Sequence, residues 1–241
     1  MSNLSRLLPL ALLSTLTMAG CAEETVSSDN IKTGGIVGLF EVTAKNDTSS
    51  TARATLVVGG DQSNTYVILE NGDNLTATAG GETKTLTTAE AGGRYEANFA
   101  TAAAGEEFSI ALNRPNDTDA LGNSGLLPAP FQFTELPTGT PSRKTDAITI
   151  KWDNGESGSL ELEVEGACIF DESFKPASGS TEYTIGADKL RSTGVNEEDK
   201  ETCDLTVTLT RTNSGSVDPA LDNDSRFRLH QVRSATFASA P

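Results

Sequence analysis

Short runs in which apolar and polar residues alternate follow one another along most of the chain, with Gly-rich or Asn-rich turn signals between them. Successive side chains of a strand point to opposite faces, so this pattern predicts strands with one buried face and one solvated face. In the first half the alternating apolar positions are Ala52, Ala54, Leu56 and Val58; Leu75, Ala77 and Ala79; Tyr95, Ala97 and Phe99; Phe108, Ile110 and Leu112; and Phe131 and Phe133.

The pattern stops in a Pro-, Gly- and charge-containing segment, residues 136–146, and then restarts. Its later apolar positions are Ile148, Ile150 and Trp152; Leu160, Leu162 and Val164; and Leu205, Val207 and Leu209. Short strands at this spacing predict an all-β fold of two antiparallel β-sandwich domains, 34–137 and 138–241. The expected likeness to an immunoglobulin domain is one of architecture only, because Trp152 precedes both later cysteines instead of lying between them.

The first 21 residues have the features of a targeting segment. Arg6 precedes a short apolar stretch, and Met18-Ala19-Gly20-Cys21 closes the segment. This ending resembles the lipobox of bacterial lipoproteins, which implies a signal peptide over 1–20 and lipidation of Cys21. Ala22 after the cysteine favours the outer membrane in that family. Residues 21–33 are polar and without period, which predicts a flexible tether between the lipid and the fold.

Charge restricts the partners. The chain carries 18 Lys+Arg and 34 Asp+Glu, a net charge of −16. Removal of Arg6 with the signal peptide leaves 17 − 34 = −17. Nucleic acid is excluded as an expected partner because phosphate binding needs a basic face. Anionic headgroups would also be repelled, so membrane attachment is expected through the N-terminal lipid alone.

Cys168 and Cys203 remain once Cys21 is assigned to the lipid. An even pair in an oxidising compartment predicts a disulfide in the second domain. Cys168 is in step with the buried positions of 160–164, and Cys203 with those of 205–209, so both thiols are expected to point inward. A metal or redox site is the alternative, but the chain has no CxxC motif and one histidine.

Catalytic motifs are absent from the sequence, which lacks GxSxG, HExxH and GxxxxGK[ST]. His230 lies in an alternating segment and is expected to be a solvent-facing strand residue. Glu161, Glu163 and Glu165 alternate along one predicted strand, and we interpret them as a solvated face instead of a paired-carboxylate site. We therefore expect no enzyme activity.

Calcium stays open as a structural ligand, with no other cofactor expected. The candidate carboxylates are Asp222 and Asp224 in one loop and Asp117 and Asp119 in another, although neither loop has EF-hand spacing. Aspartate is also an ordinary turn residue. Aromatic residues make up 5% of the chain, which disfavours sugar binding on aromatic platforms.

Scattered short motifs resemble those of uncharacterised β-rich bacterial envelope lipoproteins. They cover 108–115, 127–131, 183–187, 203–211, 215–220 and 231–233. The resemblance implies a β-rich fold and an envelope location, and no activity. We therefore expect a lipid-anchored envelope protein, anchored probably-outer-membrane lipoproteins being its model, with a non-enzymatic structural or protein-interaction role and with an envelope protein as partner. A calcium- or carbohydrate-binding envelope module is the alternative.

Overall fold

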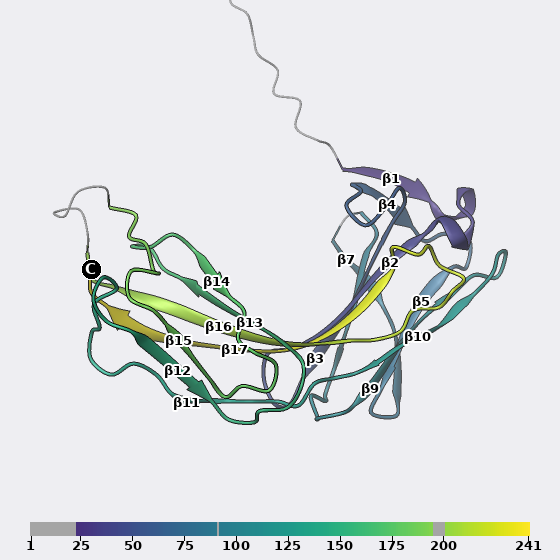
Figure 1. The fold of residues 1–241 in the computed structure, drawn as a ribbon. Helices are drawn as coiled ribbons and strands as arrows, with labels where there is room; N and C mark the ends of the chain where they lie inside the picture. Colours follow the sequence, from purple (N-terminus) through teal and green to yellow (C-terminus); the bar gives the residue numbers. More distant parts are fainter. Residues whose placement is uncertain (1–22, 91, 195–200) are drawn as a thin grey trace, which may run out of the picture.

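The computed structural model describes residues 23–90, 92–194 and 201–241 (Figure 1). Apart from two 3-10 turns, Ser28–Asn30 and Thr33–Gly35, the regular elements of these residues are strands. In chain order they are β1 (Glu24–Ser27), β2 (Val37–Ala44), β3 (Ser50–Val57), β4 (Thr65–Ile68), β5 (Asn74–Ala79), β6 (Glu82–Thr85), β7 (Thr87–Glu90), β8 (Arg94–Phe99), β9 (Glu107–Asn113), β10 (Ala120–Leu126), β11 (Phe133–Glu135), β12 (Ile148–Trp152), β13 (Ser159–Glu165), β14 (Glu172–Phe174), β15 (Glu182–Ile185), β16 (Cys203–Ser214) and β17 (Arg226–Ser239). The predicted all-β class is confirmed.

Two hydrophobic cores form two β-sandwiches, as the alternating pattern predicts. In the first, β2, β3 and β8 pack on a four-stranded sheet of order β10-β9-β5-β6. In the second, β13 and β16 pack on a three-stranded sheet of order β11-β12-β15. The predicted inward positions, such as Leu75, Ile110, Trp152 and Leu162, are at most 2% exposed.

One sheet belongs to both sandwiches. Its ten strands run β1-β4-β3-β2-β17-β16-β13-β14, with β8 paired to β3 and β7 paired to β8; we call it the shared sheet. Most pairs are antiparallel as predicted, but β1 pairs with β4 and β17 pairs with β2 in parallel. Figure 1 shows the long β16–β17 hairpin running from one lobe of the molecule into the other.

The predicted division between residues 137 and 138 does not separate the two cores. Phe131 lies in the second core, whereas Leu221, Phe227 and Leu229 lie in the first. The reason is the length of β17, whose first half pairs with β2 while its second half contributes Phe237 to the second core. Each sandwich therefore needs residues from both sides of the predicted boundary.

The prediction of a flexible tether over 21–33 is wrong for residues 24–33. Here β1 pairs with β4, and Ser28 and Thr33 are buried. The cause is Arg114, which is 3% exposed and donates hydrogen bonds to the backbone oxygens of Ser28 (2.7 Å) and Ile31 (3.0 Å) and to the Thr33 hydroxyl (3.1 Å). Asp73 pairs with the same guanidinium at 2.9 Å. A buried cation distant in sequence thus holds the segment against the first sandwich.

The hairpin changes character where it passes between the two cores. Its inward side carries Arg211 and Arg233 there, and their guanidinium carbons lie 5.0 Å and 5.7 Å from the ring centre of Phe131. Arg211 donates to the Ala129 carbonyl at 2.9 Å, and Arg233 forms an ion pair with Asp47 of the β2–β3 loop. Both cations stack on one aromatic ring, so the junction is polar but closely packed.

Candidate functional site

The face of the shared sheet that points away from the two cores is the candidate functional surface; we call it the open face. Figure 1 shows the two smaller sheets on the outer side of the bend along β16–β17, so that the open face lies on its inner side. Cross-strand register brings like positions into rows on this face. Thr43, the register partner of Thr51 and of His230, belongs to a row that continues to Asn98 and Thr212.

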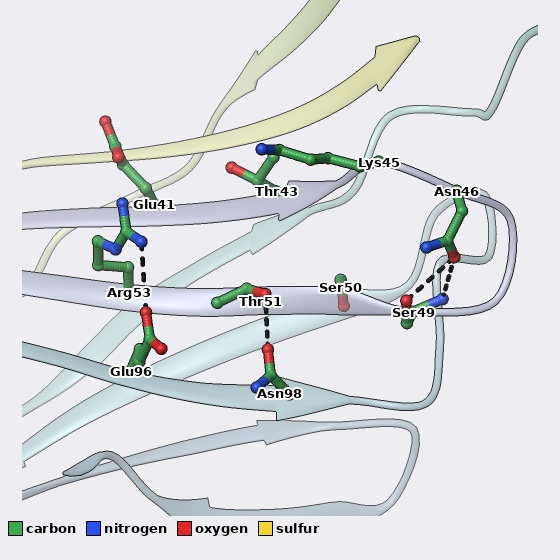
Figure 2. A pocket seen from close by; sticks show the side chains of 10 residues that line it. All are labelled: Glu41, Thr43, Lys45, Asn46, Ser49, Ser50, Thr51, Arg53, Glu96 and Asn98. Atoms are coloured by element: carbon green, nitrogen blue, oxygen red, sulfur yellow. Dashed lines mark hydrogen bonds and ion pairs between the residues drawn. The ribbon is translucent and has the colours of Figure 1, made fainter. Parts of the chain in front are cut away.

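A hollow of about 540 Å³ lies on the open face of the first sandwich, at the end of the β2–β3 hairpin (Figure 2). Its side chains come from the outward positions of β2, β3 and β8 and from the hairpin loop. They are Glu41, Thr43, Lys45, Asn46, Ser49, Ser50, Thr51, Arg53, Glu96 and Asn98. The alternation of the three strands explains this set, because the residues between them are the core residues of the same strands.

Hydrogen bonds fix part of the lining. Arg53 pairs with Glu96 at 3.3 Å, and the Thr51 hydroxyl donates to Asn98 Oδ1 at 2.7 Å. The loop is held by Asn46, whose Oδ1 accepts from the backbone N–H of Ser49 at 2.8 Å. These contacts are drawn in Figure 2 and hold the rim of the hollow in one conformation.

Other polar groups of the hollow are not used within the protein. In the part of the chain that the structure describes, the carboxylate of Glu41, the ammonium of Lys45 and the hydroxyl of Thr43 make no hydrogen bond or ion pair. The amide nitrogen of Asn98 likewise donates to no described group, since the side chain is engaged through Oδ1. The hollow thus presents both donors and acceptors to a ligand.

His230 lies on the open face beside the hollow, on the side of its strand that alternation predicts. Its Nδ1 is 2.8 Å from the Thr212 hydroxyl. Burial lowers the pKa of His230 below its ordinary value, and the nearby carboxylate of Glu41 opposes this only in part. The imidazole is therefore half-buried and neutral at pH 7, where the prediction had only a solvent-facing residue.

The predicted disulfide is confirmed. Cys168 and Cys203 are bonded, with Cα atoms 6.1 Å apart, and both contribute to the second core as their parity predicts. Cys21, the predicted lipidation site, lies outside the described residues. Glu161, Glu163 and Glu165 lie exposed on β13, on the open face of the second sandwich.

The carboxylates proposed as calcium ligands serve other contacts. Asp222 accepts from the backbone N–H of Asp224 at 2.9 Å, as in an ordinary Asp turn. Asp119 accepts from the backbone N–H of Arg114 at 2.6 Å. The backbone N–H of Thr118 lowers the pKa of Asp117, and the neighbouring cations add to this. Among the described residues, no three side chains of His, Cys, Asp or Glu gather closely enough to hold a metal ion.

Sequence reasoning missed the hollow and the buried arginines. The strand alternation already places Thr43, Thr51 and Arg53 on a solvated face, but only the parallel pairing of β2 with β17 shows that this face continues into the second sandwich. Across the described ranges, no helix has the length and apolar character that a bilayer span needs.

Comparisons with known proteins give only distant structural likenesses. No protein-family model matches the chain, and no curated protein matches it. A two-domain fibronectin type III segment of chicken tenascin is 9% identical, with 85% of this chain and 99% of that chain covered and a TM-score of 0.25. The adhesin InvE of Yersinia pseudotuberculosis is 14% identical, with 83% of this chain and 58% of that chain covered and a TM-score of 0.23. The structural neighbours are thus fibronectin-type-III and adhesin structures at low similarity.

Proposed function

We propose that this chain is a lipid-anchored envelope protein that acts by binding a partner on the open face of its shared sheet. The observation that carries the proposal is the continuity of that face across both sandwiches, through β2, β17 and β16. A surface built on paired strands is rigid, and rigid surfaces bind with a small loss of conformational entropy. The hollow of about 540 Å³ is its most recessed part.

A binding role fits the site better than catalysis. The only histidine, His230, is engaged by the hydroxyl of Thr212, and burial lowers its pKa. The carboxylate Glu96 is paired with Arg53. Such contacts position polar groups for recognition, and an activated nucleophile beside a base is the arrangement that acyl-transfer catalysis would need.

The proposed anchor sets the distance of the fold from the bilayer. Ala22 and Glu23 are the only residues between Cys21 and β1. Three residues span at most about 10 Å, so a lipid on Cys21 holds the first sandwich against the membrane surface. With a mature charge of −17 from 17 Lys+Arg and 34 Asp+Glu, the chain gains no attraction from anionic headgroups, and the lipid supplies the attachment.

Site-directed photo-crosslinking in intact cells tests the binding surface. A photoreactive residue placed at Thr43 or Thr51 should give a reproducible adduct. The same residue at Thr184, exposed on the small outer sheet of the second sandwich, is the matched control. Equal adducts from all three positions, or none from the open face, would contradict the proposal.

Fatty-acid labelling tests the anchor separately. The chain should incorporate labelled palmitate and fractionate with membranes, and Cys21→Ser should abolish both. Retention of label in the Cys21→Ser variant would show that the attachment, if present, lies elsewhere. The two experiments are independent, since a soluble variant can still be crosslinked by a partner.

A further inference from the structure

The hollow lies on the face of the shared sheet and away from its edges. Every strand beneath it is paired on both sides: β2 with β17 and β3, β3 with β2 and β8, and β8 with β3 and β7. Their backbone N–H and C=O groups are therefore engaged in the sheet, and an extended peptide cannot add as a further strand there. A ligand in the hollow must be recognised by side chains alone.

The lining excludes two ligand classes by its composition. It contains no aromatic ring and no large aliphatic side chain, so it has little to offer an apolar ligand. Its charges balance, since Lys45 and Arg53 are matched by Glu41 and Glu96. A ligand of high net charge would meet a like charge wherever it lay in the hollow, and this favours a neutral one.

Hydroxyl-rich ligands match the groups that the protein leaves unused. Glu41 can only accept hydrogen bonds, Lys45 can only donate them, and Thr43 can do either. The amide nitrogen of Asn98 adds a further donor. A sugar hydroxyl both donates and accepts, so adjacent hydroxyl groups can satisfy the opposite members of this set at the same time.

The site is long enough for a chain. A second recess shares Glu41 and Arg53 with the hollow and extends to Thr55 and Arg94. Along β3, the distance from Ser49 to Thr55 is about 20 Å at the usual rise of a strand. Outward side chains repeat there at every second residue, which suits a ligand with regularly repeated polar groups.

We infer that the hollow binds a neutral, extended oligosaccharide through hydrogen bonds to Glu41, Thr43, Lys45 and Asn98. This inference rests on the proposed function, because it names the chemistry of the partner that the open face takes. It is independent of calcium and of the aromatic platforms that the sequence lacks.

Saturation-transfer NMR on the full chain in phosphatidylcholine nanodiscs tests the inference without any sugar-based detergent. The probes are maltohexaose, cellohexaose, laminarihexaose and chitohexaose, with hexagalacturonate as the anionic comparison and a Ser/Asn-rich hexapeptide as the peptide comparison. We expect at least one neutral oligosaccharide to bind more tightly than both comparisons. Glu41→Gln and Asn98→Ala should each weaken that binding at least about fivefold, since each removes a hydrogen-bonding group.

Glu163→Gln is the matched control, because Glu163 is an exposed carboxylate on the open face of the other sandwich. It should leave the affinity unchanged. Absence of binding by every neutral probe, preference for hexagalacturonate or the peptide, or equal affinity in all three variants would each overturn the inference. A crosslinked protein partner at Thr43 together with no saccharide binding would overturn this inference alone and leave the proposed function standing.

Discussion

The buried ion pair of Arg114 offers the most direct test of how the N-terminal segment is held. Both side chains of the Arg114–Asp73 pair are 3% exposed, and their N···O distance is 2.9 Å. Replacing Arg114 with Met keeps most of the side-chain volume but leaves the Asp73 carboxylate and the Ser28 carbonyl without their donor. Breaking one side of a buried pair costs about 3–5 kcal/mol, so we expect Arg114→Met to lower the free energy of unfolding by that amount.

Urea unfolding followed by circular dichroism measures the loss, and hydrogen exchange locates it. Amides of β1 and of the 3-10 turn Ser28–Asn30 should lose protection first, because Arg114 binds the carbonyls of this segment. The control is Arg53→Met, which breaks an exposed pair with Glu96 and should cost below about 1 kcal/mol.

A double variant separates the ion pair from the hydrogen bonds. Adding Asp73→Asn to Arg114→Met removes the uncompensated buried charge and should recover about 1–2 kcal/mol. If Arg114→Met costs no more than Arg53→Met, or if β1 keeps its full protection, the view that Arg114 folds the segment is refuted.

Three further variants or conditions test other parts of the fold. Reduction of the Cys168–Cys203 disulfide, which closes a loop with a sequence separation of 35, should lower stability by about 3–4 kcal/mol in the chain-entropy model, measured by urea unfolding with and without reductant. Gly215→Ala should cost about 1–3 kcal/mol in thermal unfolding, because its Cβ would lie 2.4 Å from the Ser124 backbone oxygen. Burial lowers the folded-state pKa of His230 below the unfolded value of 6.5, so its contribution to stability is present above pH 6.5 and is lost as the pH falls from there through the lower folded-state pKa. His230→Gln should flatten this part of the pH–stability curve, and an unchanged curve would show that other groups cause it.

The local elements of the fold could be predicted from the sequence because they depend on alternation within a few residues. Leu160, Leu162 and Val164 fall on one face of a strand whatever the partner strand is, and all three are buried. The disulfide followed from the same parity together with the count of cysteines. These predictions needed no knowledge of which strands pair.

Long-range pairing could not be predicted in this way. The parallel pairing of β17 with β2 joins residues nearly two hundred positions apart, and no local pattern specifies it. The polar segment 24–33 was interpreted as a tether because its own composition offers little burial, whereas its order comes from Arg114. The hollow depends on three strands at once, so its existence followed only from the sheet order.

The polar junction explains how one sheet can serve two sandwiches without a flexible joint. An apolar inward side at this point would have to be covered by a third core, but Arg211 and Arg233 instead stack on Phe131 and donate to neighbouring backbone and loop groups. The partner of Arg233 is Asp47, in the same β2–β3 loop that contributes Asn46 and Ser49 to the hollow. The ion pair that stabilises the junction therefore also fixes the rim of the hollow. Removing it with Asp47→Ala should loosen the loop and weaken ligand binding in the hollow while both cores stay folded, and an unchanged affinity would separate the two roles.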